Sequence, residues 1–322
     1  MNNSSLTRRT FLQHLSMASA AGFVAGSPAS FFTDAQSSQK PHIDFPAAPR
    51  DRIAIASYPF RAYINTPGNR DRDSKLAGMD FTVFPMHVLD KFGIRNVEPY
   101  GPHFASLDPA YLDRFVGAVH KVEGKVVNIA ASVKQSFYDP DAAVRAQAIA
   151  GAKQWIDAAV VLHSPSVRLH ISGAKNSAPN LDRCVESFRP IVEYAESKNV
   201  VVNLENDDLV TEDAFFIVKV IESLKNPYLH ALPDFANSAM KGDSDFNYRA
   251  VTAMFQHAYN ICHVKDGEAD EKGQYINIDM KRTFEILKAS NFRGYCSMEY
   301  DAAGDPYAPT TKFIEQTLKY LA

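Results

Sequence analysis

Four residues with metal-binding side chains stand at the ends of short apolar segments in the second half of the chain. They are Glu205, Asp234, His263 and Glu299. They follow one another at intervals of 29, 29 and 36 residues, which leaves room for one loop, one helix and one return loop each time. The apolar segments have the length and the β-branched or aromatic content of buried strands. The recurrence predicts one divalent-metal site at the mouth of a barrel.

The chemistry of the four donors narrows the choice of ion. Three carboxylates and one imidazole suit Mn²⁺, Mg²⁺, Co²⁺ or Zn²⁺, and we expect a single ion with Mn²⁺ favoured. Four protein ligands leave two positions of an octahedron for neighbouring carbonyl and hydroxyl oxygens of a substrate. A cation bound there would ease removal of the proton beside the carbonyl. Two flanking carboxylates would serve as general base and general acid.

The segments that carry these residues belong to a regular alternation of strands and helices. Strands are predicted at 53–58, 94–98, 125–130, 167–170, 200–205, 229–234, 260–263 and 294–299. Helices are predicted at about 84–92, 109–122, 141–161, 181–197, 211–224, 246–258, 280–289 and 309–321. Eight such units predict an α/β fold, a single (β/α)8 TIM barrel. The alternative is an open doubly wound sheet, which would spread the four ligands along a row.

The N-terminal segment has the pattern of an export signal. Arg8 and Arg9 precede an apolar run from Leu15 to Gly26, which predicts a twin-arginine signal peptide over residues 1–35. A disordered basic tail and a short membrane anchor are the alternatives, but the run is about half of the ~20 residues that a spanning helix needs. A proline-containing linker is predicted at 36–51 and the catalytic barrel at 52–322.

This signal predicts where the protein works. The protein would first bind the twin-arginine export machinery. It would then be located in the periplasm or otherwise outside the cytoplasm. If the signal were not cleaved, the protein would stay tethered to the membrane.

Composition sets the class of protein. The chain has 322 residues, of which 46% are hydrophobic and 22% charged, enough to bury one large core. The net charge of −3 offers no basic field for nucleic acid. Cys262 and Cys296 alternate with His263 and Ser297, so they face the helices and are expected to be buried small side chains. Homo-oligomerisation is left open.

Further polar residues lie at the same predicted mouth. Glu98 and His170 end the second and fourth strands, and each would either bind substrate or anchor a loop. Lys265 lies two residues after His263 and points the same way, so it would hold a substrate oxygen or form an ion pair with Asp266. Arg168 lies deeper on the fourth strand, and we expect a structural ion pair for it.

Several motifs give the chain a resemblance to a known superfamily. These are Asn96–Glu98, Asn203–Asn206, Pro233–Asn237, His263–Gly267 and Met298–Tyr300. With them the chain resembles the sugar phosphate isomerase/epimerase superfamily of xylose isomerase-like TIM barrels, over nearly all of residues 53–321. The superfamily includes ketose 3-epimerases, hydroxypyruvate isomerases and inosose dehydratases. The order Glu, Asp, His, Glu of the four ligands is the specific part of the resemblance.

The resemblance also implies roles for individual residues. In the epimerase branch, the ligands that match Glu205 and Glu299 are the acid-base pair on opposite faces of a cis-enediolate. That branch has a substrate-binding histidine three residues after the aspartate, where this chain has Asn237. It also has an arginine a few residues after the metal-binding histidine, where this chain has Glu268.

The leading hypothesis is a metal-dependent isomerase or epimerase that acts on a sugar or cyclitol derivative. A lyase or dehydratase with the same metal site, acting on a keto-sugar or an oxidised glycoside, is the second. An abasic-site endonuclease is disfavoured because the chain lacks a basic groove. A non-catalytic periplasmic sugar-binding module is the alternative from a different class.

Overall fold

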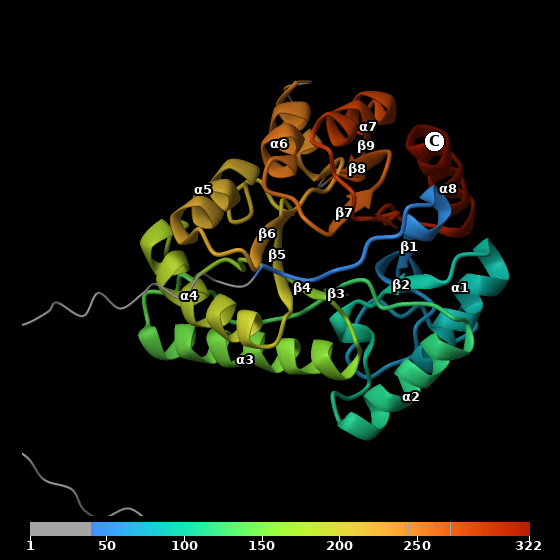
Figure 1. The fold of residues 1–322 in the computed structure, drawn as a ribbon, viewed down its shortest axis with the longest axis horizontal. Helices are drawn as coiled ribbons and strands as arrows, with labels where there is room; N and C mark the ends of the chain where they lie inside the picture. Colours follow the sequence, from blue (N-terminus) through green and yellow to red (C-terminus); the bar gives the residue numbers. More distant parts are fainter. Residues whose placement is uncertain (1–39, 242, 244, 271) are drawn as a thin grey trace, which may run out of the picture. The chain divides into compact units, whose positions relative to one another are not determined.

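The computed structural model describes residues 40–322 except 242, 244 and 271 (Figure 1). The predicted signal peptide lies outside these residues. The strands of the barrel are β1 (Ile53–Ala56), β2 (Asn96–Glu98), β3 (Ile129–Ala130), β4 (Ser166–Leu169), β5 (Val201–Glu205), β6 (Leu229–Leu232), β7 (Ile261–Val264) and β10 (Tyr295–Met298). The helices are α1 (Phe84–Phe92), α2 (Pro109–Lys121), α3 (Ala142–Val161), α4 (Leu181–Ser197), α5 (Ala214–Leu224), α6 (Phe246–Phe255), α7 (Met280–Ala289) and α8 (Tyr307–Leu321).

The strands are parallel and pair in two groups of four, in the orders β2-β1-β10-β7 and β3-β4-β5-β6. Single parallel bridges join the two groups. Val97 pairs with Val126 on one side, and Asp234 pairs with His263 on the other. The bridges complete a ring, and the helices surround it in Figure 1. The second of these bridges places Asp234, which follows β6, next to His263 of β7.

Four of the helices begin where the sequence supplies a capping side chain. Asp141, Asn180, Asp213 and Asp279 each accept a hydrogen bond from a backbone N–H of the first turn of α3, α4, α5 and α7. Each cap satisfies a donor that the helix itself leaves without a partner. The helices then bury their apolar faces against the outer face of the strands, where the main hydrophobic core lies.

The inside of the barrel is unusually polar. Asn128, Ser166, Asn203 and Asn260 are fully or almost fully buried and are bonded to one another. Barrels of this class are commonly filled by branched apolar side chains. Here an amide network takes their place, and its member Asn203 stands on β5 two residues before the predicted ligand Glu205.

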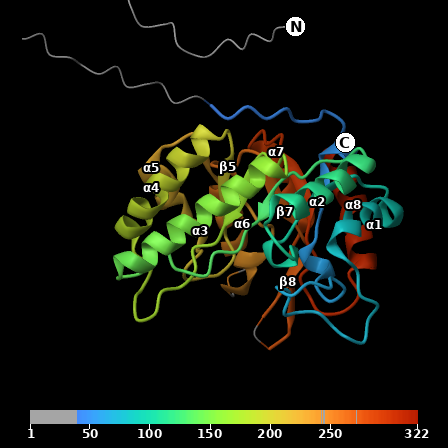
Figure 2. The same cartoon turned by 90° about the horizontal axis from the view of Figure 1, so that it is seen from below.

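The end of the barrel opposite the predicted site is covered by the segment that enters it. Phe45 packs edge-on against Tyr259 and Tyr295, and the Tyr259 hydroxyl donates to the carbonyl of Pro41. The described part of the predicted linker therefore packs against the barrel floor. Figure 2 shows this segment and strand β8 at opposite ends of the molecule.

The sequence did not predict a hairpin that follows β7. Strands β8 (Gly267–Ala269) and β9 (Tyr275–Asn277) pair in antiparallel fashion above the barrel mouth. The Tyr275 hydroxyl donates to Asp266 at 2.7 Å, and Lys312 of α8 donates to the same carboxylate. The hairpin is thus fixed at its base. Among the described residues, no helix is long and apolar enough to cross a membrane.

Candidate metal and acid-base site

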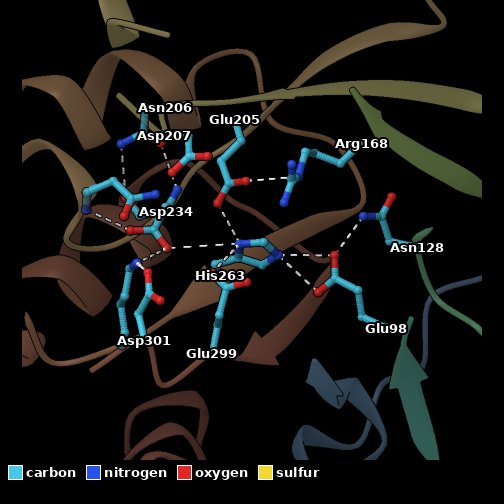
Figure 3. A network of polar contacts seen from close by, with 12 residues as sticks. Glu98, Asn128, Arg168, Glu205, Asn206, Asp207, Asp234, His263, Glu299 and Asp301 are labelled. Carbon is cyan, nitrogen blue, oxygen red and sulfur yellow. Dashed lines mark hydrogen bonds and ion pairs between the residues drawn. The ribbon is translucent and has the colours of Figure 1, made fainter. Parts of the chain in front are cut away.

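The four residues predicted as metal ligands meet at one place in the barrel mouth. Glu205 ends β5, Asp234 follows β6, His263 lies on β7 and Glu299 follows β10. One ligand atom from each lies within 4.8 Å of the other three, and all four side chains are buried (Figure 3). The side chains point toward one another, as the sequence analysis predicted.

The spacing of the donors is suited to one ion. The Nδ1 atom of His263 is 2.6 Å from Glu205 Oε1, 3.0 Å from Glu299 Oε2 and 4.0 Å from Asp234 Oδ2. An octahedral ion with ligands at about 2.1 Å would separate neighbouring donors by roughly 3.0 Å and opposite donors by roughly 4.2 Å. The observed separations are close to both values.

The contacts of Asp234 are the clearest indication that a cation can bind at this site. Its Oδ1 atom accepts hydrogen bonds from the backbone N–H groups of Ala236 and Asn237 at 2.8 Å. Its Oδ2 atom is buried and accepts no hydrogen bond from any described residue. Burial raises the pKa of Asp234 to about 8, helped by Glu205 and Glu299 and opposed by Lys265. A carboxylate group in this position is short of positive charge, so the residues present fit a bound divalent cation.

The second ring nitrogen of His263 faces another carboxylate. Nε2 lies 3.1 and 3.0 Å from the two oxygens of Glu98, and Asn128 Nδ2 donates to Glu98 Oε1 at 2.7 Å. Burial alone would lower the pKa of His263, but Glu299, Glu98 and Glu205 raise it well above its usual value. Glu98, predicted as a substrate-binding residue, is 1% exposed and lies behind the imidazole. Its side chain does not line the barrel mouth.

Glu205 has a second charged partner. Arg168 Nε lies 2.9 Å from Glu205 Oε2, and both side chains are buried, as the predicted structural ion pair requires. Burial opposes ionisation of Glu205, yet His263 and Arg168 hold its pKa far below the usual value. His170 contacts Arg168 with one ring nitrogen and Glu212 with the other, at 2.9 Å. His170 therefore connects Arg168 to Glu212, which agrees with the anchoring role rather than with substrate binding.

The ammonium group of Lys265 is enclosed by acids. It lies 2.6 Å from Glu268, 3.3 Å from Asp301 and 3.6 Å from Asp234. Burial would lower its pKa, but these carboxylates raise it well above the usual value. The alternative ion pair with Asp266 is wrong, because Asp266 pairs with Lys312 instead. Lys265 contributes positive charge beside Asp234.

Several residues of the site were not singled out from the sequence. Asp207 and Asp301 each stand two residues after a predicted ligand. Residues two apart on a strand point to the same side, so this spacing could have predicted that both lie at the site. Glu212 and Asn128 carried no such signal. Asn237, which was expected to bind substrate, is buried, and its backbone N–H donates to Asp234 Oδ1.

Aromatic and basic side chains stand near the acids at the mouth. The rings of Tyr58 and Tyr100 pack edge-on at 5.1 Å, and the guanidinium of Arg61 lies 4.3 Å from the centre of the Tyr58 ring. Burial raises the pKa of Tyr58, and Asp301 adds to the effect. Arg61 is held by the backbone carbonyl of Asp301 at 2.7 Å. These residues form an aromatic wall next to the carboxylates.

Comparison with known proteins identifies the class to which this fold and site belong. Residues 86–322 match the model of the xylose isomerase-like TIM barrel family, and the chain belongs to that family. The prediction of a TIM barrel is confirmed. A comparison with curated protein sequences finds no match.

Solved structures share this fold at low sequence identity. The 3-keto-D-glucoside 4-epimerase of E. coli is 14% identical, with 84% of this chain and 98% of that chain covered and a TM-score of 0.61. The D-allulose 3-epimerase of Methylomonas sp. is 13% identical, with 86% and 100% covered and a TM-score of 0.65. The probable 3-DHS dehydratase of Bacillus anthracis is 12% identical, with 82% and 97% covered and a TM-score of 0.59.

Proposed function

We propose that the protein is a metal-dependent sugar isomerase or epimerase that removes a proton next to a carbonyl group. The placement of Glu205 and Glu299 against one nitrogen of His263, at 2.6 and 3.0 Å, carries the proposal. The two glutamates come from β5 and β10, which lie three places apart in the ring of strands. A small molecule held between them has one carboxylate on each side.

The roles of the residues follow from their contacts. Glu205, Asp234, His263 and Glu299 would hold one divalent ion, with Mn²⁺ favoured over Mg²⁺, Co²⁺ and Zn²⁺. When bound, the ion supplies Lewis-acid polarisation of a substrate carbonyl. One glutamate takes the proton from the adjacent carbon, and the other returns a proton on the opposite face of the cis-enediolate.

The surroundings favour a sugar or cyclitol substrate. The aromatic wall of Tyr58 and Tyr100 offers faces on which the C–H side of a sugar ring can pack. Two of the solved structures named above are sugar epimerases, which supports the same class of substrate.

Hydrogen exchange into substrate tests the proposal. The purified protein, loaded with Mn²⁺, is incubated in deuterated water with keto-sugars and 3-keto-glycosides. We expect deuterium at the carbon beside the carbonyl, together with the epimer or isomer. Absence of exchange with all of them, in protein shown to contain the metal, contradicts the proposal.

A lyase or dehydratase is the second candidate. The observation in its favour is Asn237, which stands where the epimerase branch has a substrate-binding histidine, together with the absence of arginine at 264–277. The probable dehydratase among the similar structures agrees with it. The same incubation separates the two, because a lyase releases a leaving group and forms a conjugated carbonyl product that absorbs ultraviolet light.

We also propose that the protein is exported by the twin-arginine route. The support is the sequence from Thr7 to Leu12, with Arg8 and Arg9 at its centre. Changing both arginines to lysine preserves the charge and removes the motif. We expect the protein in the periplasmic fraction of wild-type cells and in the cytoplasm of the variant. Equal export of both forms would contradict this route.

A further inference from the structure

We propose that Glu98 is a positioning residue, which fixes the proton of His263 on Nε2 and thereby leaves Nδ1 to face the metal ligands. This role rests on the metal site of the proposed function and not on the reaction. Nδ1 is the nitrogen that lies near Glu205, Asp234 and Glu299, whereas Nε2 faces only Glu98 among these acids.

The amide network of the barrel interior sets which way each hydrogen bond to Glu98 runs. The Ser166 hydroxyl donates to Asn128 Oδ1 at 2.6 Å. Asn128 must therefore present its Nδ2 to Glu98 Oε1, at 2.7 Å. Asn260 donates to Ser166 and completes the chain.

Because Glu98 accepts from Asn128, it acts as a carboxylate acceptor toward the imidazole as well. Both of its oxygens lie within 3.1 Å of Nε2, so that nitrogen is held as the donor. A histidine whose outer N–H is bonded to a carboxylate has a fixed ring orientation and a more basic inner nitrogen.

Glu98→Gln tests the role. The amide oxygen of the new side chain can accept from Asn128 Nδ2, and its amide nitrogen then faces His263 Nε2 and favours the other tautomer. We expect the affinity for Mn²⁺, measured by titration calorimetry of the metal-free protein, to fall about 10- to 100-fold. Glu98→Asp should recover part of the affinity. Asn128→Ala should weaken binding in the same direction by a smaller factor.

Asn203→Ala is the matched control, because it removes a buried amide of the same network that does not touch Glu98. Its Mn²⁺ affinity should stay within about twofold of wild type. Nitrogen NMR of the Zn²⁺-loaded protein, with the His263 signal assigned by its loss in His263→Gln, should show the proton on Nε2 in wild type and an altered signal in Glu98→Gln.

Three results would overturn the role: wild-type affinity in folded Glu98→Gln, an equal loss in Asn203→Ala, or no metal binding by the wild-type protein. If Glu98→Gln does not fold, Asn128→Ala decides by the same measurements. A protein that binds Mn²⁺ in this way and converts no sugar would refute the proposed reaction and leave the role of Glu98 standing.

Discussion

Glu299 has fewer contacts than Glu205, the other glutamate of the proposed acid-base pair. It approaches His263 with one oxygen at 3.0 Å, whereas both oxygens of Glu205 are taken by His263 and Arg168. Glu299→Gln keeps the size of the side chain and removes its ability to take a proton. We expect turnover to fall at least about 100-fold, because general acid-base catalysis contributes that factor or more. Steady-state kinetics on the metal-loaded protein measure the loss.

Glu285→Gln on the exposed face of α7 is the control, and its turnover should match wild type. A catalytically unimportant Glu299 would give turnover equal to that control. A sugar-binding module would show no turnover in either form and unchanged sugar affinity in both.

The ion pair of Arg168 with Glu205 is predicted to contribute to stability. Both side chains are buried, so Arg168→Met leaves a carboxylate without its guanidinium partner. We expect the free energy of unfolding to fall by on the order of 3 kcal/mol, since removal of one partner of a buried pair is costly. Urea unfolding of the metal-free protein measures it. Arg145 pairs with Glu186, which is largely exposed, so Arg145→Met should lower the free energy of unfolding by less than about 1 kcal/mol. Equal losses in the two variants would contradict the argument.

At the scale of residues, the sequence indicated the candidate metal ligands but not the network that holds them. The ligands could be predicted because each ends an apolar strand, and parallel strands of a barrel bring such ends together. The pairing of Glu98 with His263 joins residues 165 positions apart. It depends on the side-chain conformation of His263, which strand alternation does not determine.

At the scale of elements, the helices and barrel strands were predicted to within four residues at each end, because helical periodicity and capping side chains are local signals. The exception is the β8–β9 hairpin, whose sequence is polar and rich in acids and lacks strand alternation. Its base is held by Lys265 and Tyr275, which bond to acids outside the paired strands. Long-range contacts of this kind leave no periodic pattern.

The 3-10 helix Gly101–His103, which follows β2, contains a buried histidine that should make stability depend on pH. Burial lowers the pKa of His103 to about 3, and its Nδ1 lies 2.9 Å from the Ser57 hydroxyl. The unfolded chain binds this proton below its ordinary pKa of about 6.5, whereas the folded chain does not. The stabilising contribution is thus complete above pH 6.5 and decreases as the pH falls toward 3.

His103→Asn keeps an acceptor near Ser57 and removes the titration. Between pH 7.5 and pH 5.0, wild type should lose about 2 kcal/mol of unfolding free energy more than the variant, as linkage requires for an ordinary pKa of 6.5. Urea unfolding at both pH values measures this difference. Parallel losses in the two proteins would show that His103 is protonated in the folded state.

At the scale of the whole molecule, the barrel brings together carboxylates from strands on different sides of the ring, and their mutual repulsion opposes folding. Asp234, Glu205 and Glu299 converge on His263, with Arg168 and Lys265 as the neighbouring cations. A divalent ion that binds the folded chain and not the unfolded one should stabilise the entire fold. The metal site is therefore predicted to set the stability of the protein as well as its chemistry.

Thermal unfolding with and without metal tests this link. At an Mn²⁺ concentration about 1,000 times the dissociation constant, the folded state should gain about 4 kcal/mol relative to protein in a chelator. For a domain of this size we expect the melting temperature to rise by several degrees. The variant Asp234→Asn lacks one of the four carboxylate or imidazole donors, so Mn²⁺ should raise its melting temperature much less. In the presence of chelator, the variant should melt no lower than wild type, because a repelling charge is gone. A melting temperature of wild type that does not respond to Mn²⁺, Mg²⁺, Co²⁺ or Zn²⁺ would exclude a metal site at these residues.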